Sequence, residues 1–348
     1  MKNSENALRI TEYTIVMSGR MSYFKPLGTT EGPKQSLGDH VFREVGKFEG
    51  ERFKKLQDPL HLTLGPPLLF FKKAEKGSSM KEIAQIAVEA ATRAGHLIAA
   101  DLGKAMITLK DSTYNLVTDA DRRSEELIAG FLLKEMPGSS CLGEETHHAA
   151  LNADRLWIVD PLDGTTNFAH GIPHFGVSVA YAEKGTILAG AVYDPMRSEL
   201  FSATLGQGAT LNGAPIHVSG NRQLTQSIIG TGFYYDRGET MEKTLGALHT
   251  LFKQNIHCMR RMGASSLDLT WLAAGRFDGY FEYTLSPWDF AAGLLILTEA
   301  GGKAIDARTA APAALFSNGL ICSNGLIHDA LVACTLNAPR YGSFPTQE

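Results

Sequence analysis

One twelve-residue string, from Trp157 to Phe168, constrains the fold of this chain more than any other part of the sequence. It opens with a short apolar run, typical of a buried strand, and the run ends on Asp160, with Asp163 three residues further on. For an Asp-x-x-Asp pair alone, aspartates that cap a helix are the simpler interpretation. The whole string instead favours a strand that brings two carboxylates to one place.

The residues after Asp163 are suited to binding an anion. Gly164 lets the backbone turn, and Thr165 and Thr166 open the next segment. If a helix begins there, its free N–H groups form an anion site. Carboxylates beside an anion require cations between them, and oxygen ligands suit Mg²⁺, which bridges to substrate phosphate.

Shorter acidic strings have simple structural interpretations when each is taken alone. Adjacent glutamates such as Glu144 and Glu145 are typical of a solvated turn. Asp119 and Asp289 are each placed where a helix N-cap is expected. These interpretations remain open until the order of the strings along the chain is considered.

Composition and charge exclude several classes of protein. The 348-residue chain has 44% hydrophobic residues and a net charge of −4, so it lacks the basic excess of a nucleic-acid-binding protein. No apolar run approaches the ~20 residues that span a bilayer, and no signal-peptide pattern is present. Four cysteines without a Cys-x-x-Cys pair predict free thiols in a reducing compartment.

Secondary-structure signals favour a layered α+β architecture for residues 80–340. An amphipathic helix is expected from Met80, a second helix after Asp119, and then a strand meander. Before about residue 225 we expect a strand over 156–159 that ends on Asp160, a hairpin over 177–193 and a strand over 200–205. Beyond about residue 225 strands and helices alternate, and the expected elements are a helix over 266–274, a strand over 279–283 and a helix over 289–300.

The acidic strings occur in a characteristic order: Val-Thr-x-x-Asp, Gly-Glu-Glu, Asp-Pro-Leu-Asp-Gly-Thr-Thr and Trp-Asp-x-Ala-Ala-Gly. In this order and spacing, residues 80 to about 335 resemble the inositol monophosphatase family. The resemblance implies an α-β-α-β-α layered sandwich of the type shared with fructose-1,6-bisphosphatases, and a homodimer. It also implies a metal-site half, residues 80–225, and a substrate-site half, residues 226–340.

Carried over residue by residue, the resemblance implies a site for two or three Mg²⁺ ions. The implied ligands are the carboxylates of Glu144, Asp160, Asp163 and Asp289 and the main-chain carbonyl of Leu162.

The resemblance also implies catalytic and substrate-binding residues. Asp121 and Thr165 would orient the attacking water, with Glu144 as a further catalytic residue. The implied substrate-binding residues are Lys110, Gly164, Thr165, Thr166, Gly263, Ser265 and Glu282.

The implied activity is hydrolysis of a small phosphomonoester by metal-activated water, in the cytoplasm and with inhibition by Li⁺. Thr166-Asn167-Phe168 after the Asp-Gly-Thr sequence favours the branch that acts on inositol phosphates. Inositol 1-phosphate is therefore the expected substrate, and fructose 1,6-bisphosphate or another sugar phosphate is the alternative. A protein that contacts the transcription machinery is an alternative from another class.

Residues 1–79 carry no recognisable motif and mix charges, prolines and glycines without periodicity. We expect this extension to be disordered or loosely attached and dispensable for activity, with Met80 as a plausible natural start. The competing interpretation is a leader that targets or regulates the enzyme. Its acidic residues are untypical of a transit peptide.

Overall fold

The computed structural model describes residues 13–17, 20–24, 79–104, 107–109, 116–233 and 237–341. The chain divides into two compact units, residues 1–70 and 71–348. In the first unit, β1 (Tyr13–Met17) and β2 (Arg20–Phe24) pair as an antiparallel hairpin. The sequence analysis predicted no element there, although β-branched residues favour a strand in β1. The predicted disorder of the rest of the extension lies outside the described residues.

The second unit contains helices of very different length. They are α2 (Met80–Asp101), α3 (Asp119–Glu135), α4 (Thr165–Ala169), α5 (Glu239–Lys253), α6 (Ser265–Ala273), α7 (Pro287–Glu299), α8 (His328–Thr335) and the short 3₁₀ turn η1 (Leu224–Gln226). In the part of the chain that the structure describes, no helix has the length and apolar character needed to cross a bilayer.

A seven-stranded sheet has the order β11-β10-β9-β8-β7-β6-β5. β5 and β6 run parallel, and the other neighbours in this sheet are antiparallel. The strands are β5 (Ser140–Gly143), β6 (Arg155–Asp163), β7 (Gly176–Glu183), β8 (Thr186–Asp194), β9 (Glu199–Thr204), β10 (Ala209–Leu211) and β11 (Ala214–Ile216).

A five-stranded mixed sheet has the order β13-β12-β14-β16-β15, and β3 and β4 form a separate pair. β12 is parallel to β13 and β14, whereas β16 is antiparallel to β14 and β15. The strands are β3 (Ile107–Leu109), β4 (Leu116–Thr118), β12 (Ile228–Thr231), β13 (Cys258–Arg260), β14 (Gly279–Glu282), β15 (Lys303–Asp306) and β16 (Leu320–Ser323).

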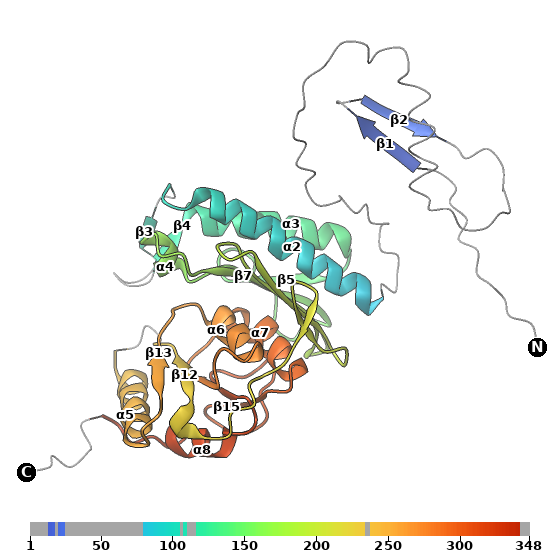
Figure 1. The fold of residues 1–348 in the computed structure, drawn as a ribbon. Coiled ribbons are helices and arrows are strands. Elements are labelled where there is room, and N and C mark those ends of the chain that lie inside the picture. Colours follow the sequence, from blue (N-terminus) through green and yellow to red (C-terminus); the bar gives the residue numbers. More distant parts are fainter. Residues whose placement is uncertain are drawn as a thin grey trace, which may run out of the picture. The chain divides into compact units, whose positions relative to one another are not determined.

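Helices and sheets alternate in five layers (Figure 1). α2 and α3 pack on one face of the seven-stranded sheet. α6 and α7 lie between the two sheets, and α8, paired with α5, packs on the far face of the five-stranded sheet. The layered α+β sandwich expected from the sequence is therefore confirmed. The two halves expected to divide near residue 225 lie in one compact unit.

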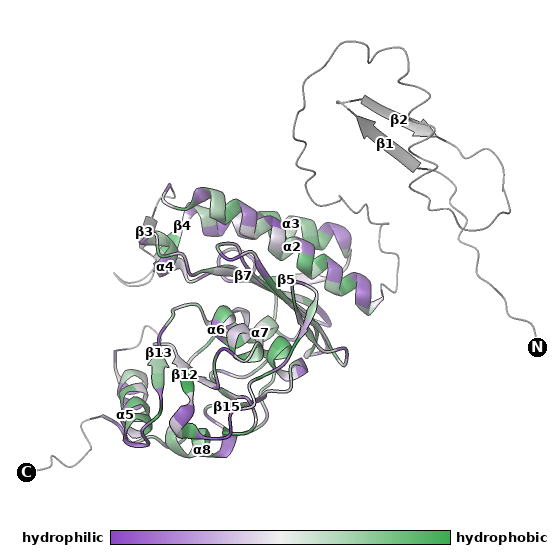
Figure 2. Ribbon diagram, in the orientation of Figure 1, coloured by the Kyte–Doolittle hydropathy of each residue, from purple (hydrophilic) through white to green (hydrophobic). Residues whose placement is uncertain are grey.

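Within the middle layer, α7 is apolar on every side because both faces of this layer are covered. α7 buries eight consecutive residues, Phe290 to Leu297. They share a core with Ile158 of the seven-stranded sheet and Tyr280 of the five-stranded sheet. Figure 2 shows this contrast, since purple and green residues alternate along α2 and α3 at the outer face. A helix that is apolar all round is a buried helix, and α7 thus has a fixed position between the sheets.

The first helix begins at Met80, as the sequence predicted, because Ser79 caps it. The Ser79 hydroxyl accepts a hydrogen bond from the Glu82 N–H, and the Glu82 carboxylate accepts one from the Ser79 N–H. This reciprocal capping box satisfies two N–H groups at the helix start. Ile83 and Ile98 lie on the buried face that packs on the sheet.

Two elements differ from the predicted boundaries by more than one residue, and both differences concern acidic residues. β6 continues past the expected end at Asp160 to Asp163, through a register shift between the two aspartates. α7 begins at Pro287 rather than Asp289, because Ser286 is the N-cap. Asp160, Asp163 and Asp289 therefore lie within regular elements, and the two aspartates of β6 are buried.

Candidate active site

The end of β6 carries Asp160 and Asp163. Because β6 pairs with β5 and β7 and is covered on both faces, the two residues are only 2% and 7% exposed. The Leu162 N–H donates to Asp160 Oδ1 at 3.0 Å across the register shift. This bond holds the Asp160 carboxylate at the end of the strand.

Glu144 directly follows β5, in a loop that a buried side chain of α3 organises. The Glu125 carboxylate accepts hydrogen bonds from the main-chain N–H groups of Glu145, Thr146 and His147 at 2.7–2.8 Å. It also accepts one from the Thr146 hydroxyl at 2.6 Å. Glu125 therefore determines the path of the chain just after Glu144.

The hydrogen bonds around Glu125 favour its ionised form. Burial alone would raise the pKa of Glu125, but the hydrogen bonds from Thr146, Glu145 and His147 hold it below its ordinary value. A Cβ at Gly143 would lie 2.5 Å from the Glu125 carboxyl carbon, so this contact requires glycine. The Gly-Glu-Glu-Thr string therefore forms a loop whose main-chain N–H groups surround the Glu125 carboxylate.

Asp289 lies in the first turn of α7, which comes from the other half of the domain. The Ser286 N–H donates to Asp289 Oδ2 at 2.7 Å, as part of a capping box. The Ser265 hydroxyl donates to the Asp289 carbonyl at 3.2 Å. The cap predicted as the simple interpretation is therefore present, but its carboxylate also lines the cavity described below.

Asp163 connects β6 to the start of α6. Its two carboxylate oxygens accept hydrogen bonds from the Ser265 N–H at 3.2 Å and the Ser266 N–H at 2.7 Å. The Ser266 hydroxyl also donates to it at 2.5 Å. The negative charge of Asp163 thus caps α6, the helix that begins beside Gly263.

Thr165 and Asp121 form a pair between the starts of α4 and α3. The Thr165 Oγ1 lies 3.0 Å from Asp121 Oδ1 and 3.0 Å from the Leu162 carbonyl. The other oxygen of Asp121 accepts from the N–H of Thr118 at 2.8 Å and from its hydroxyl at 2.6 Å. Burial raises the pKa of Asp121 to about 6. Gly164, which precedes the pair, has a φ of 89° that favours glycine.

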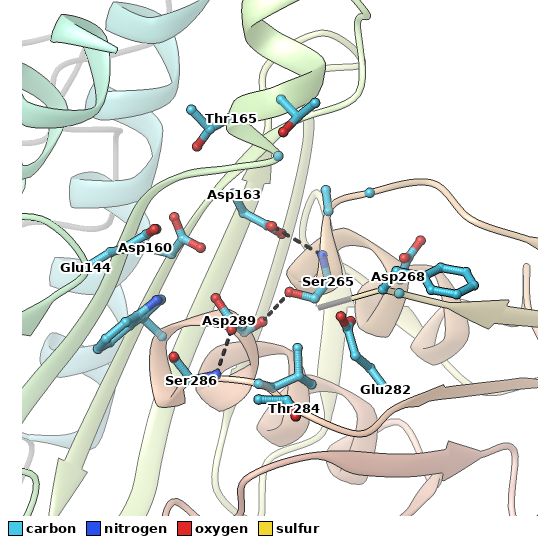
Figure 3. A pocket seen from close by; sticks show the side chains of 18 of the residues that line it. Glu144, Asp160, Asp163, Thr165, Ser265, Asp268, Glu282, Thr284, Ser286 and Asp289 are labelled. Atoms are coloured by element: carbon cyan, nitrogen blue, oxygen red, sulfur yellow. Dashed lines mark hydrogen bonds between the residues drawn. The ribbon is translucent and has the colours of Figure 1, made fainter. Parts of the chain in front are cut away.

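One cavity of about 310 Å³ brings most of the predicted site residues together (Figure 3). Figure 3 shows Glu144 and Asp160 at one side and Glu282 and Asp268 at the other. The predicted residues that line it are Glu144, Asp160, Leu162, Asp163, Gly164, Thr165, Thr166, Gly263, Ser265, Glu282 and Asp289. Asp121 reaches it through Thr165, and Lys110 lies outside the described residues.

The carboxylates at one side of the cavity repel one another. Burial, together with the charges of Glu144, Asp163 and Asp289, raises the pKa of Asp160 well above its ordinary value. Burial and the charge of Glu144 do the same to the pKa of Asp289. Crowded buried carboxylates stay ionised only where cations offset their charge.

The donor set fits a hard divalent cation such as Mg²⁺. Carboxylate oxygens and the Leu162 carbonyl are oxygen ligands, and Mg²⁺ keeps part of its water shell when it binds to such groups. Among the described residues, no three acidic, histidine or cysteine side chains are close enough to hold one ion as they stand. The fit therefore rests on the ligand type and on the mutual repulsion, which a bound cation relieves.

The other side of the cavity contains acidic residues of a different kind. Glu282 is 8% exposed and accepts a hydrogen bond from the Tyr280 hydroxyl at 2.5 Å. Burial raises the pKa of Glu282 to about 7. Asp268 and Arg261 line the same part of the site, and neither was among the predicted site residues.

Sequence reasoning missed Glu125, Tyr280 and Asp268. Asp268 follows Ser265 by one helical turn, so the segment that opens α6 carried a signal that could have found it. Glu125 had no such signal, because its partners lie 20–22 residues further along the chain.

Comparison with known proteins agrees with this geometry. The profile described as "Inositol monophosphatase family" matches residues 79–339. An inositol-1-monophosphatase of Rhizobium meliloti is 40% identical over 251 residues, which are 71% of this chain and 93% of that protein. A Pseudomonas aeruginosa protein named Nus factor SuhB is 41% identical over 235 residues, 65% of this chain and 86% of that protein.

A solved structure gives the same result for the fold. The inositol monophosphatase of Anabaena is 36% identical, superimposes with a TM-score of 0.68 and covers 76% of this chain and 99% of its own. The profile match and these relatives confirm the resemblance seen in the order of the acidic strings. The chain belongs to the inositol monophosphatase family.

Proposed function

We propose that this chain is a Mg²⁺-dependent phosphomonoesterase that hydrolyses inositol 1-phosphate, and that it acts as a cytoplasmic homodimer. The observation that carries the proposal is the single cavity lined by carboxylates from β6, the loop after β5 and α7, with the Thr165–Asp121 pair at its edge. The family is one of metal-dependent phosphatases. A relative named inositol-1-monophosphatase supports the choice of substrate.

The chain's own residues would divide the work of hydrolysis. Glu144, Asp160, Asp163, Asp289 and the Leu162 carbonyl would hold the ions. Bound Mg²⁺ supplies positive charge for the phosphate and leaving oxygen and lowers the pKa of a water.

The Thr165–Asp121 pair would orient that water. With Asp121 ionised, its Oδ1 accepts a hydrogen bond from the Thr165 hydroxyl, which leaves the Thr165 oxygen free to accept one from a water in the cavity. Gly164 and Thr165 would present main-chain N–H groups to the phosphate, as their place at the start of α4 suggests.

A substrate panel tests this proposal. The full chain is treated with chelator and assayed, with and without Mg²⁺, on inositol 1-phosphate, fructose 1,6-bisphosphate, 3′-phosphoadenosine 5′-phosphate and histidinol phosphate. We expect no activity in chelator, recovery with Mg²⁺, inhibition by Li⁺, and the highest kcat/KM for inositol 1-phosphate. Full activity in excess chelator contradicts the metal site. Preference for fructose 1,6-bisphosphate supports the alternative sugar phosphatase, and preference for the nucleotide contradicts both.

A role in transcription is the second candidate, because one relative is named Nus factor SuhB. An Asp163→Asn variant separates this role from catalysis in cells. Loss of the cellular function supports phosphatase activity as the function, whereas retention supports a binding role. Light scattering on the purified chain tests the homodimer.

A further inference from the structure

Asp268 is a buried carboxylate that the proposed hydrolysis does not use. It lies on α6 and is 1% exposed. Its Oδ1 has no hydrogen-bond partner within the described part of the chain. A buried polar oxygen without a partner destabilises the folded protein, so such an oxygen calls for a partner from outside the chain, such as a water, an ion or a ligand.

The position of Asp268 shows where such a ligand would lie. Asp268 lines the same cavity as the proposed cation ligands, on the side occupied by Glu282 (Figure 3). In Glu282, one carboxylate oxygen accepts from the Tyr280 hydroxyl. Two buried carboxylates thus face one end of a cavity whose other end is suited to a phosphate.

The chemistry of this end favours a ligand that donates hydrogen bonds and carries no negative charge. An unprotonated carboxyl oxygen accepts hydrogen bonds, and hydroxyl groups are the donors that a sugar or cyclitol supplies. A ring with neighbouring hydroxyls, bound through its phosphate at the other end, would present several donors toward Asp268 and Glu282.

We infer that Asp268 is a specificity-determining residue that accepts a hydrogen bond from a ring hydroxyl of a polyol phosphate, beside Glu282. This inference rests on the proposed function and deepens it, because it names the part of the substrate that Asp268 reads. No bond is made or broken at Asp268, and its role is confined to binding and orientation.

A comparison of two substrates tests the inference. Phenyl phosphate has the phosphate but no ring hydroxyl, whereas inositol 1-phosphate has both. We expect Asp268→Leu to lower the ratio of kcat/KM for inositol 1-phosphate to that for phenyl phosphate by roughly tenfold, as for a lost hydrogen bond that leaves the partner group unpaired. Asp268→Asn keeps an acceptor oxygen and should restore part of the ratio.

The control is Thr270→Val on the same helix. Thr270 is buried, and its hydroxyl donates to the Leu267 carbonyl within the helix. This variant changes buried polarity in α6 without reaching the cavity, so the substrate ratio should stay at the wild-type value. An equal fall of the ratio in Thr270→Val and Asp268→Leu would overturn the inference.

Deoxy analogues of inositol 1-phosphate identify the hydroxyl, and the first measurement is made on the wild type alone. In the wild type, removal of the hydroxyl that Asp268 reads should lower kcat/KM about as much as Asp268→Leu does. In Asp268→Asn the same removal should cost less. If wild type and Asp268→Asn respond equally to every deoxy analogue, Asp268 reads no hydroxyl and the inference is wrong.

The two proposals fail in different ways. If the wild type hydrolyses neither substrate with Mg²⁺, the proposed function is wrong and this inference falls with it. If the wild type hydrolyses both but Asp268→Leu leaves their ratio unchanged, only the inference is wrong.

Discussion

The Thr165 hydroxyl lies 3.0 Å from the Asp121 carboxylate, across 44 residues of chain and at the starts of two different helices. Asp121 is fully buried, and its second oxygen is occupied by Thr118. The pair can therefore act on the cavity only through the threonine oxygen.

The first prediction concerns this pair. Asp121→Asn and Thr165→Ala should each lower kcat by roughly 10²–10⁴-fold, the range for a positioned acid–base group. The double variant should lose little more than either single one, because the two residues act as a unit. Steady-state kinetics with Thr165→Ser as the hydroxyl-retaining control check this. If the losses of kcat in the two single variants add up in the double variant, the two residues act independently and the prediction is wrong.

The second prediction concerns the ligand supplied by α7. Asp289→Asn can still accept from the Ser286 N–H, so the helix should form, but turnover should fall on the order of 100-fold or more as cation charge stabilisation is lost. Asp306→Asn is the control, since the Asp306 carboxylate also accepts hydrogen bonds from main-chain N–H groups, in a turn away from the cavity. Asp306→Asn should lower the melting temperature and leave the turnover unchanged. Near-normal activity of Asp289→Asn would show that α7 supplies no ligand.

The third prediction concerns Glu125, which shapes the loop after Glu144 without lining the cavity. Glu125→Gln cannot accept all of the N–H groups that the carboxylate accepts, so the loop should loosen. The Mg²⁺ concentration for half-maximal activity should rise about 10–100-fold, as for other residues that orient metal ligands. Glu126→Gln, the exposed neighbour on α3, should have no such effect. The same Mg²⁺ dependence in both variants would contradict this role of Glu125.

Part of the fold and of the site could be predicted from local sequence patterns. The helix from Met80 has regular apolar spacing, and β6 with its two aspartates is one continuous string, so neither needed distant contacts. Glu125 and Asp268 could not be assigned in this way. Glu125 acts on a loop 20 residues away, and Asp268 looks like any polar residue on a helix until the second sheet places Glu282 opposite it.

The fourth prediction is a pH dependence of stability in the metal-free protein. Burial raises the pKa of Glu282 to about 7 from an ordinary value of 4.5. The unfolded chain loses this proton at lower pH than the folded chain, so the contribution of Glu282 to stability is complete below about pH 4.5 and declines as the pH rises to about 7. The whole shift corresponds to roughly 3 kcal/mol.

Glu282→Gln removes this titration. The free energy of unfolding of the variant, relative to the wild type, should therefore increase between about pH 4.5 and 7. Urea unfolding in chelator, at several pH values across this window, measures the difference. A difference that stays constant with pH would contradict the prediction.

The fifth prediction concerns residues 1–79 and the Ser79 cap. A chain that begins at Ser78 should fold and hydrolyse substrate like the full chain. A chain that begins at Met80 lacks the capping box and should be less stable by about 1 kcal/mol, the usual cost of losing an N-cap. Activity assays and thermal unfolding of both chains check this. An insoluble or inactive Ser78 chain would show that the extension is required.

Asp163 connects the two ends of the cavity through hydrogen bonds. Its carboxylate comes from β6, yet Ser265 and Ser266 at the start of α6 donate to it, and the same helix carries Asp268. A cation that binds to this carboxylate therefore competes with the N–H groups in the first turn of α6 for the same oxygens. If inositol and Mg²⁺ bind as proposed, linkage makes that competition reciprocal: the factor by which inositol changes the affinity for Mg²⁺ equals the factor by which Mg²⁺ changes the affinity for inositol.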